Sequence, residues 1–179
     1  HGAHVEDVRQ RSPEAGFDVI PANADLTAAE VELVSTTTKE NRLRYALARV
    51  KHEYDYMLID CPPSLNMLTV NALVAADSVL IPVQCEYYAL EGLSSLLNTV
   101  TRVQRMLNPQ LRIEGLLRTM YDARNSLTND VSMQLIGHFG SRVYATLIPR
   151  NVRLAEAPSH GKPALLYDAA SRGAIAYLA

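Results

Sequence analysis

The sequence predicts an α/β protein whose doubly wound, mostly parallel sheet carries helices on both faces. Two observations support this prediction. Short apolar runs alternate along the chain with segments of helical periodicity. The apolar runs are also continuous, which is typical of parallel strands buried on both faces and unlike the alternation of a half-exposed strand. At 179 residues, the chain is expected to form one domain over residues 1–179.

The first third of the chain is expected to hold a strand, two helices and a second strand. The run at 16–22 is predicted to be a short strand that Pro21 ends. Apolar residues recur at helical spacing over 26–35 and again over 39–53, so both segments are predicted to be helices. The second strand is predicted over 54–60, because four residues that could be buried on both faces precede its last residue, an aspartate.

From residue 64 onward, helices and strands are expected to alternate regularly. Ser64 and Ser126 precede two apolar periodic segments, and each is predicted to be an N-cap, because a serine oxygen accepts a hydrogen bond from a first-turn amide. The predicted helices span 64–76, 90–107 and 126–140, the predicted strands span 78–84, 113–121 and 142–149, and another helix is expected within 173–179.

Composition favours a globular protein outside the membrane. Hydrophobic residues make up 48% of the chain and charged residues 20%, which is ordinary for this class. The sequence has neither an apolar run long enough to cross a bilayer nor an N-terminal secretion signal, so we expect a cytoplasmic protein. Its two cysteines, Cys61 and Cys85, are too few for a disulfide framework or a zinc site. Both are expected to be reduced and buried.

The charge is distributed unevenly along the chain. Residues 1–60 hold 11 acidic and 7 basic side chains, whereas residues 118–179 hold 4 acidic and 7 basic ones, six of them arginines. A basic C-terminal third suggests a polyanionic partner. On composition alone, a solvated charged face explains the excess equally well.

Asp60 is a candidate metal-binding residue. It ends a predicted apolar strand, and Pro62 and Pro63 directly after it cannot continue a strand ladder. Ligands of doubly wound sheets bind outside the carboxyl ends of the strands. A carboxylate there could hold Mg²⁺ through water beside a nucleotide phosphate. The alternative is an aspartate that only stabilises a turn.

A phosphate-binding loop is absent from the sequence. The Walker A pattern needs a glycine five residues before its Gly-Lys pair and a serine or threonine after it. The only Gly-Lys pair is Gly161-Lys162, which has Glu156 before it and Pro163 after it. The local pattern around Asp60 therefore lacks the partner that would identify a nucleotide site.

Four long stretches follow the pattern of one family. They are YDYMLIDCPPSLNMLTVNAL (54–73), VLIPVQCEYYALEGL (79–93), GLLRTMYDAR (115–124) and IPRNVRLAEAPSHGKPALLYDAASRGA (148–174). In them the chain closely resembles the ParA/Soj family of chromosome and plasmid partitioning ATPases, in the branch that also holds MinD. Family members begin with a strand and a deviant Walker A loop, K-G-G-x-G-K-[ST]. The resemblance thus implies a P-loop NTPase-like fold that is incomplete at the N-terminus.

The resemblance also implies cofactors and site residues. The full-length parent would use ATP or ADP with Mg²⁺, and Asp60 would be the catalytic Walker B aspartate that holds Mg²⁺-bound water. The family positions that surround the adenine correspond to Met120, Pro149, Arg150 and Asn151. The last three would otherwise be a simple helix start. Glu86 corresponds to a region that faces the dimer partner, where it would meet that partner's lysine or nucleotide. Tyr87 and Tyr88 are expected to be buried structural residues.

The same resemblance gives the basic C-terminal third a use. The family positions that contact DNA correspond best to Arg124 and Arg153, then to Arg150, Lys162 and Arg172, whereas Arg142 is expected to lie on a solvated face. Spaced arginines would contact DNA phosphates without reading the bases.

The predicted function is that of a ParA-type partitioning ATPase. It would dimerise with ATP, bind DNA non-specifically on the nucleoid and hydrolyse ATP under the stimulation of a ParB-type partner. The chain as given is expected to be inactive, because it lacks the P-loop lysines. Two alternatives stay open: a membrane-associated, MinD-like positioning ATPase, and a non-catalytic α/β module that binds DNA or a partner.

Overall fold

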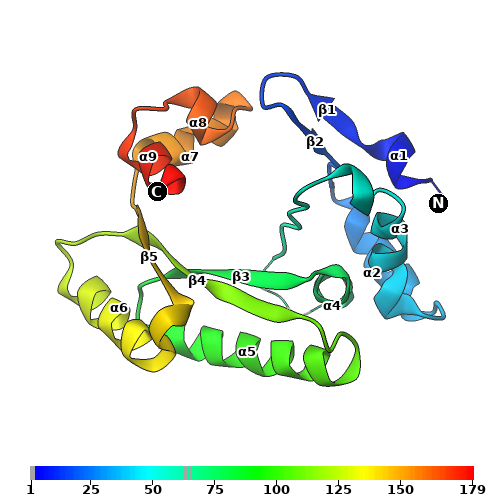
Figure 1. Cartoon of the computed structure of the whole chain (residues 1–179), viewed down its shortest axis with the longest axis horizontal. Helices are drawn as coiled ribbons and strands as arrows, with labels where there is room; N and C mark the ends of the chain where they lie inside the picture. The colour runs from blue at the N-terminus through cyan, green and yellow to red at the C-terminus, as the bar shows by residue number, and fades with distance from the viewer. Residues whose placement is uncertain (1–2, 63, 65) are drawn as a thin grey trace. The chain divides into compact units, whose positions relative to one another are not determined.

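The computed structural model describes residues 3–62, 64 and 66–179 (Figure 1). The α/β class is confirmed, because helices pack on a sheet formed by β3 (Ser78–Gln84), β4 (Arg112–Tyr121) and β5 (Val143–Pro149) in that order, in which β4 and β5 run parallel. The chain divides into two compact units, each formed by two separate stretches. The first unit comprises His1–Ser78 and Asn98–Arg112, and the second comprises Val79–Leu97 and Ile113–Ala179.

The first unit is mainly helical. Its two short strands form an antiparallel hairpin that pairs Gln10 with Val19 and Ser12 with Phe17, and they do not join the parallel sheet. The hairpin turns at Gly16, whose φ of 76° is readily adopted only by glycine. The elements of this unit are α1 (Val5–Val8), β1 (Gln10–Ser12), β2 (Phe17–Val19), α2 (Asp25–Val34), α3 (Arg42–Ala48), α4 (Met67–Ala75) and the last part of α5 (Ala89–Met106).

Two buried asparagines hold the first unit together. Asn71 on α4 accepts a hydrogen bond from the amide of Leu43 and donates one to the carbonyl of Lys39, which joins α4 to the start of α3. Asn108 follows α5 and satisfies carbonyls at the end of α4, where no intrahelical donor remains. Its side-chain amide donates to the carbonyls of Leu73 (3.0 Å), Val74 (3.2 Å) and Ala76 (2.9 Å).

The prediction of a strand over 54–60 is wrong. This segment has no regular structure, and the side chains of Tyr56 and Leu58 are 88% and 95% exposed. A strand requires a hydrogen-bonded neighbour, and within the described residues no other strand pairs with this segment. The start of the segment is instead held by side chains, because the Tyr54 hydroxyl accepts from Arg9 and donates to Asp18.

Other local predictions for the helices need smaller corrections. The helix predicted over 39–53 is interrupted, with only α3 in α-helical form between two 3₁₀ turns. The two serine caps are wrong, because Asn66 caps α4 and Asn125 caps α6 (Ser126–Phe139). An asparagine oxygen accepts the same first-turn hydrogen bond as a serine oxygen, so the local pattern did not distinguish the neighbouring positions.

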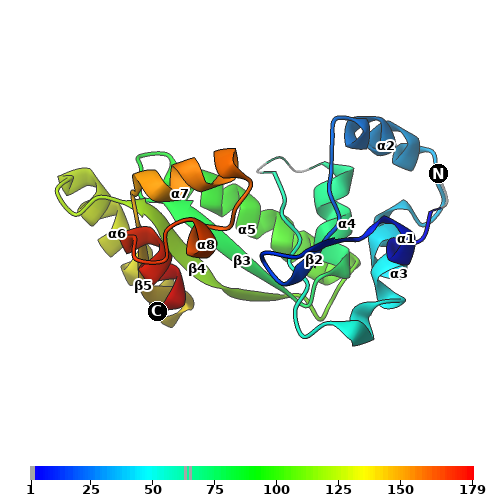
Figure 2. The same cartoon turned by 90° about the horizontal axis from the view of Figure 1, so that it is seen from above.

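The second unit is built around the three-stranded sheet. Its core joins β3 and β4 to α5 and α6, which lie along one face of the sheet (Figure 1). The remaining helices form a small cluster after β5, in which α9 packs against β5 (Figures 1 and 2). Its other elements are β3 (Ser78–Gln84), β4 (Arg112–Tyr121), β5 (Val143–Pro149), α7 (Val152–Glu156), α8 (Ala164–Tyr167) and α9 (Arg172–Leu178).

Burial differs from the prediction at three positions. Cys85 is buried, as expected, and burial raises the pKa of its thiol. Cys61 is exposed, because the segment that holds it does not enter a sheet. Tyr87 and Tyr88 are each 73% exposed and contact each other edge to face, with ring centroids 5.0 Å apart. They follow the end of β3 in a turn, so no layer covers them.

Among the helices formed by the described residues, none is long and apolar enough to cross a bilayer.

Candidate functional site

The carboxyl ends of β4 and β5 bring several predicted site residues to one edge of the sheet. Tyr121 lies opposite Pro149 in the parallel pairing, and the amide of Arg150 donates to the carbonyl of Tyr121 at 3.0 Å. Met120 precedes Tyr121 in β4, and Asn151 follows Arg150. The four positions predicted to surround an adenine are therefore adjacent in space, as expected for parallel strand ends.

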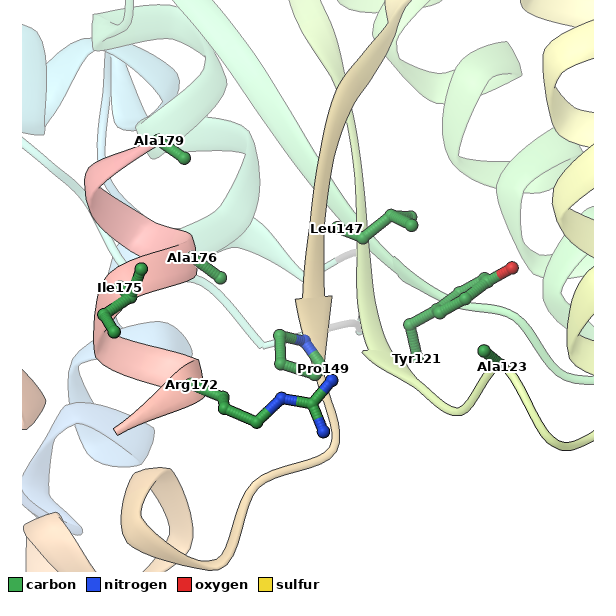
Figure 3. Close-up of a pocket in the computed structure, with 8 residues that line it drawn as sticks. All are labelled: Tyr121, Ala123, Leu147, Pro149, Arg172, Ile175, Ala176 and Ala179. Carbon is green, nitrogen blue, oxygen red and sulfur yellow. The ribbon is translucent and has the colours of Figure 1, made fainter. Parts of the chain in front are cut away.

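A pocket of about 440 Å³ opens beside these strand ends (Figure 3). Most of its wall comes from β4, β5 and α9, and it is mainly apolar, with the guanidinium of Arg172 as a polar group. The hydroxyl of Tyr121 points away from α9 and donates to Asn129 on α6 at 2.6 Å. The side chain of Arg172 lies beside Pro149 in this view. The lining residues are Tyr121, Ala123, Leu147, Pro149, Arg172, Ile175, Ala176 and Ala179.

The backbone is strained at the edge of this site. Met120 has φ of 52°, in the left-handed region that residues other than glycine rarely adopt. It lies at an irregularity of the β4–β5 pairing between Arg118 and Tyr121, where β4 holds one residue more than β5. Strained backbone of this kind persists only where the surrounding structure imposes it, and it concentrates at functional sites.

Asn151 is the N-cap of α7. Its side-chain oxygen accepts from the amides of Arg153 (2.9 Å) and Leu154 (3.3 Å). The alternative interpretation of Pro149-Arg150-Asn151, a helix start, is therefore correct for Asn151. That role occupies its side-chain oxygen, while its amide group makes no hydrogen bond within the described residues.

Arg124 is highly exposed and forms an ion pair with Asp122. Its Nε and Nη2 donate to the two carboxylate oxygens of Asp122 at 2.9 and 2.8 Å. The hydrogen bonds from the side chain and backbone of Arg124, with the nearby charge of Arg150, lower the pKa of Asp122 to about 2. The cation predicted to meet DNA is thus held in place by a carboxylate that is ionised at neutral pH.

Replacing Arg124 by alanine is expected to raise the pKa of Asp122 from about 2 toward its ordinary value of 3.8. Because the pKa is lowered in the folded state, the stabilisation by this pair is present above pH 3.8 and is lost as the pH falls toward 2. Carboxyl NMR titration of both proteins measures the change. An unchanged midpoint for Asp122 would contradict the pairing.

Arg153 is also paired with carboxylates. Its Nη1 lies 2.8 Å from Glu156 Oε2, and its Nε lies 3.4 Å from Asp168 Oδ2. Glu156 in turn accepts from the hydroxyl of Tyr167 at 3.2 Å. Lys162 is exposed in the turn before α8. Arg172, predicted to contact DNA, lies at the N-terminus of α9 and lines the pocket.

Of the predicted site residues, only Pro149 and Arg172 line the pocket. Met120, Arg150 and Asn151 lie next to the lining residues in the chain but are not part of the lining, and Glu86 and Asp60 do not line it either. Glu86 is exposed in the turn between β3 and α5, where its carbonyl accepts from the amide of Ala89. Asp60 is exposed and belongs to the first unit, whereas the pocket belongs to the second. In residues 3–62, 64 and 66–179, no three acidic, histidine or cysteine side chains gather as a metal site. The predicted Mg²⁺ role of Asp60 relies on water-mediated contact and stays a prediction.

Sequence reasoning missed most of the pocket wall. Tyr121, Leu147 and Ile175 line the pocket but were interpreted only as parts of a strand or helix. Only Tyr121 had a signal, since it ends a strand directly after the predicted Met120. Sequence reasoning also missed Arg118, a buried arginine in β4.

Comparison with known proteins shows the family to which the chain belongs. A family model described as an AAA domain matches residues 2–113. An uncharacterized protein of Pseudomonas putida is 66% identical over 168 residues, which cover 94% of this chain and 64% of that protein. The sporulation initiation inhibitor protein Soj of Bacillus subtilis is 59% identical over 176 residues, which cover 98% of this chain and 70% of Soj. The chain belongs to the ParA/Soj family.

A solved structure supports the same assignment of the fold. The cobyrinic acid a,c-diamide synthase of Mycobacterium smegmatis, crystallised with ADP and magnesium, matches with a TM-score of 0.81 and 35% identity. The match covers 98% of this chain and 64% of the synthase. The present chain therefore spans slightly less than two thirds of both the synthase and the uncharacterized P. putida protein.

Proposed function

We propose that the chain is part of a ParA-type partitioning ATPase, which segregates chromosomes or plasmids. In this proposal the full-length protein dimerises with ATP, binds non-specific DNA on the nucleoid and hydrolyses ATP when a ParB-type partner stimulates it. The observation that carries the proposal is the pocket at the ends of β4 and β5, in a chain 59% identical to Soj.

The adenine end of ATP or ADP would occupy this pocket. Its volume of about 440 Å³ lies in the range of small-molecule sites. Tyr121 and Pro149 offer apolar surface to a base, and Arg172 offers a cation to the polar part of the nucleotide. The ADP and magnesium in the M. smegmatis synthase support a nucleotide as ligand of this fold.

Hydrolysis would require groups beyond this pocket. Mg²⁺ would offset phosphate charge, and Asp60 would hold it through water. The sequence contains no K-G-G-x-G-K-[ST] loop, whose lysines neutralise the phosphates in the family. The 179-residue chain alone is therefore expected not to hydrolyse ATP.

DNA binding is assigned to arginines of the second unit. Arg124 and Arg153 expose 88% and 54% of their side chains, and both are paired with carboxylates. Each would exchange its carboxylate for a DNA phosphate. Contacts of this kind are sequence-independent and salt-dependent, because each releases a counterion from DNA.

The decisive experiment measures DNA binding by the full-length protein with ATP and Mg²⁺, using fluorescence anisotropy on two unrelated duplexes. Both duplexes are expected to bind equally. Arg124→Ala and Arg153→Ala are each expected to reduce the magnitude of the negative slope of log K against log salt by about one, in a titration from about 50 to 200 mM salt.

Arg142→Ala is the matched control, because Arg142 is an exposed arginine of the same unit that we assign to a solvated face. It is expected to leave the slope unchanged. If neither Arg124→Ala nor Arg153→Ala weakens binding, the assignment of these arginines to DNA is wrong. Equal binding with ATP, with ADP and without nucleotide would instead favour a non-catalytic DNA-binding module.

A further inference from the structure

Arg118 is a buried arginine in the middle of β4. Only 6% of the residue is exposed, and none of its nitrogen atoms pairs with a carboxylate within the described residues. Burying an unpaired charge costs free energy, so its hydrogen bonds must offset that cost. Its Nη1 donates to the hydroxyl of Ser132 on α6 at 2.8 Å, and its Nη2 donates to the carbonyls of Tyr144 (2.8 Å) and Ala145 (3.3 Å).

The two accepting carbonyls lie in an irregular part of β5. Leu116 pairs with Val143 and Arg118 pairs with Leu147, so β5 advances four residues where β4 advances two. Tyr144 and Ala145 fall within this excess. Extra residues in one strand leave backbone groups outside the regular ladder. The guanidinium of Arg118 donates hydrogen bonds to two of these backbone carbonyls and so links β5 to β4 where their pairing is irregular.

The offset determines which residues meet at the pocket. From the pair Arg118–Leu147 the strands continue, through the second irregularity at Met120, to Tyr121 opposite Pro149. Leu147, Pro149 and Tyr121 all line the pocket. A change in the pairing at Arg118 would therefore move both strand walls of the pocket relative to each other.

We propose that Arg118 is a positioning residue: by binding the Tyr144 and Ala145 carbonyls, it sets the offset of β5 against β4 and so the spacing of the pocket walls. The inference rests on the proposed function of the pocket as a nucleotide site. Arg118 itself does not line the pocket and acts through Tyr121, Leu147 and Pro149.

The test compares Arg118→Leu, Arg118→Lys and Ser132→Ala in the full-length protein. Arg118→Leu removes the donors and is expected to raise KM for ATP about tenfold, with kcat within about twofold, since the walls bind the base and do not contact the reacting phosphate. Arg118→Lys keeps a cationic donor and is expected to raise KM only about threefold. Ser132→Ala removes only the bond to α6, so KM is expected to stay unchanged.

Thermal unfolding of each variant separates loss of folding from loss of positioning. If Arg118→Leu does not fold, the comparison of Arg118→Lys with Ser132→Ala decides, and equal KM values for these two variants overturn the inference. Tyr121→Ala tests the pocket itself. If it leaves KM unchanged, the proposed nucleotide site is wrong. If it raises KM while the Arg118 variants do not, the nucleotide site stands and the positioning role fails.

Discussion

Replacing Asp60 by asparagine is expected to lower kcat for ATP hydrolysis by the full-length protein on the order of 10²–10³-fold. Asparagine matches the size of aspartate but lacks the charge that would hold Mg²⁺ and its water. The fold should be unaffected, because Asp60 is exposed and makes no hydrogen bond or ion pair within the described residues. Steady-state phosphate release with saturating ATP and Mg²⁺ measures the effect.

Asp55→Asn is the matched control for this prediction. Asp55 lies in the same irregular segment as Asp60 and is also exposed, so its replacement changes the net charge of the segment by the same amount. It is expected to leave kcat unchanged. If the two variants behave alike, Asp60 has no special catalytic role and acts only as a surface or turn aspartate.

Replacing Leu135 by alanine is expected to lower the free energy of unfolding by about 3 kcal/mol, within the range of about 2–5 for buried leucines. Leu135 lies on α6, has no exposed surface and packs in the core with β3, β4 and α5. Its truncation removes apolar contact and leaves a cavity, since the sheet on the other side cannot collapse completely. Urea unfolding of the chain, followed by circular dichroism, measures the loss.

Met133→Ala controls for changes in helix propensity and sequence. Met133 lies on the same helix, two residues earlier, but is 63% exposed. Its replacement is expected to change the free energy of unfolding by less than about 0.5 kcal/mol. Similar losses for both variants would mean that α6 does not pack on the sheet as described.

The regular elements of the second unit were predictable from local patterns. The strand predicted over 78–84 coincides with β3, and the helix predicted over 90–107 differs from α5 by one residue at each end. The strands predicted over 113–121 and 142–149 match β4 and β5 to within one residue. In these segments the apolar period and the chain breakers agree with the tertiary packing, so local information was sufficient.

The segment over 54–60 shows where such reasoning fails. Its four consecutive residues with apolar surface gave the same signal as β3, yet Leu58 is 95% exposed. An apolar run reports what a segment could bury, whereas a strand also needs a partner to accept its hydrogen bonds. The prediction that Tyr87 and Tyr88 are buried was wrong for a similar reason, because the hydrophobic character of a side chain does not show whether another layer covers its turn.

The candidate site depends on two kinds of information, the local sequence pattern and the tertiary contacts. The sequence by itself determined the α/β class, the family resemblance and the place of Met120, Pro149 and Arg150 at strand ends, because these depend on order along the chain. Only the tertiary structure decided that Arg172 lines the pocket and that Arg118 binds the carbonyls of β5. Arg118 and Ala145, for example, are 27 residues apart in the sequence. Contacts over such separations depend on the strand offset and on how the helix docks, and local periodicity does not encode either.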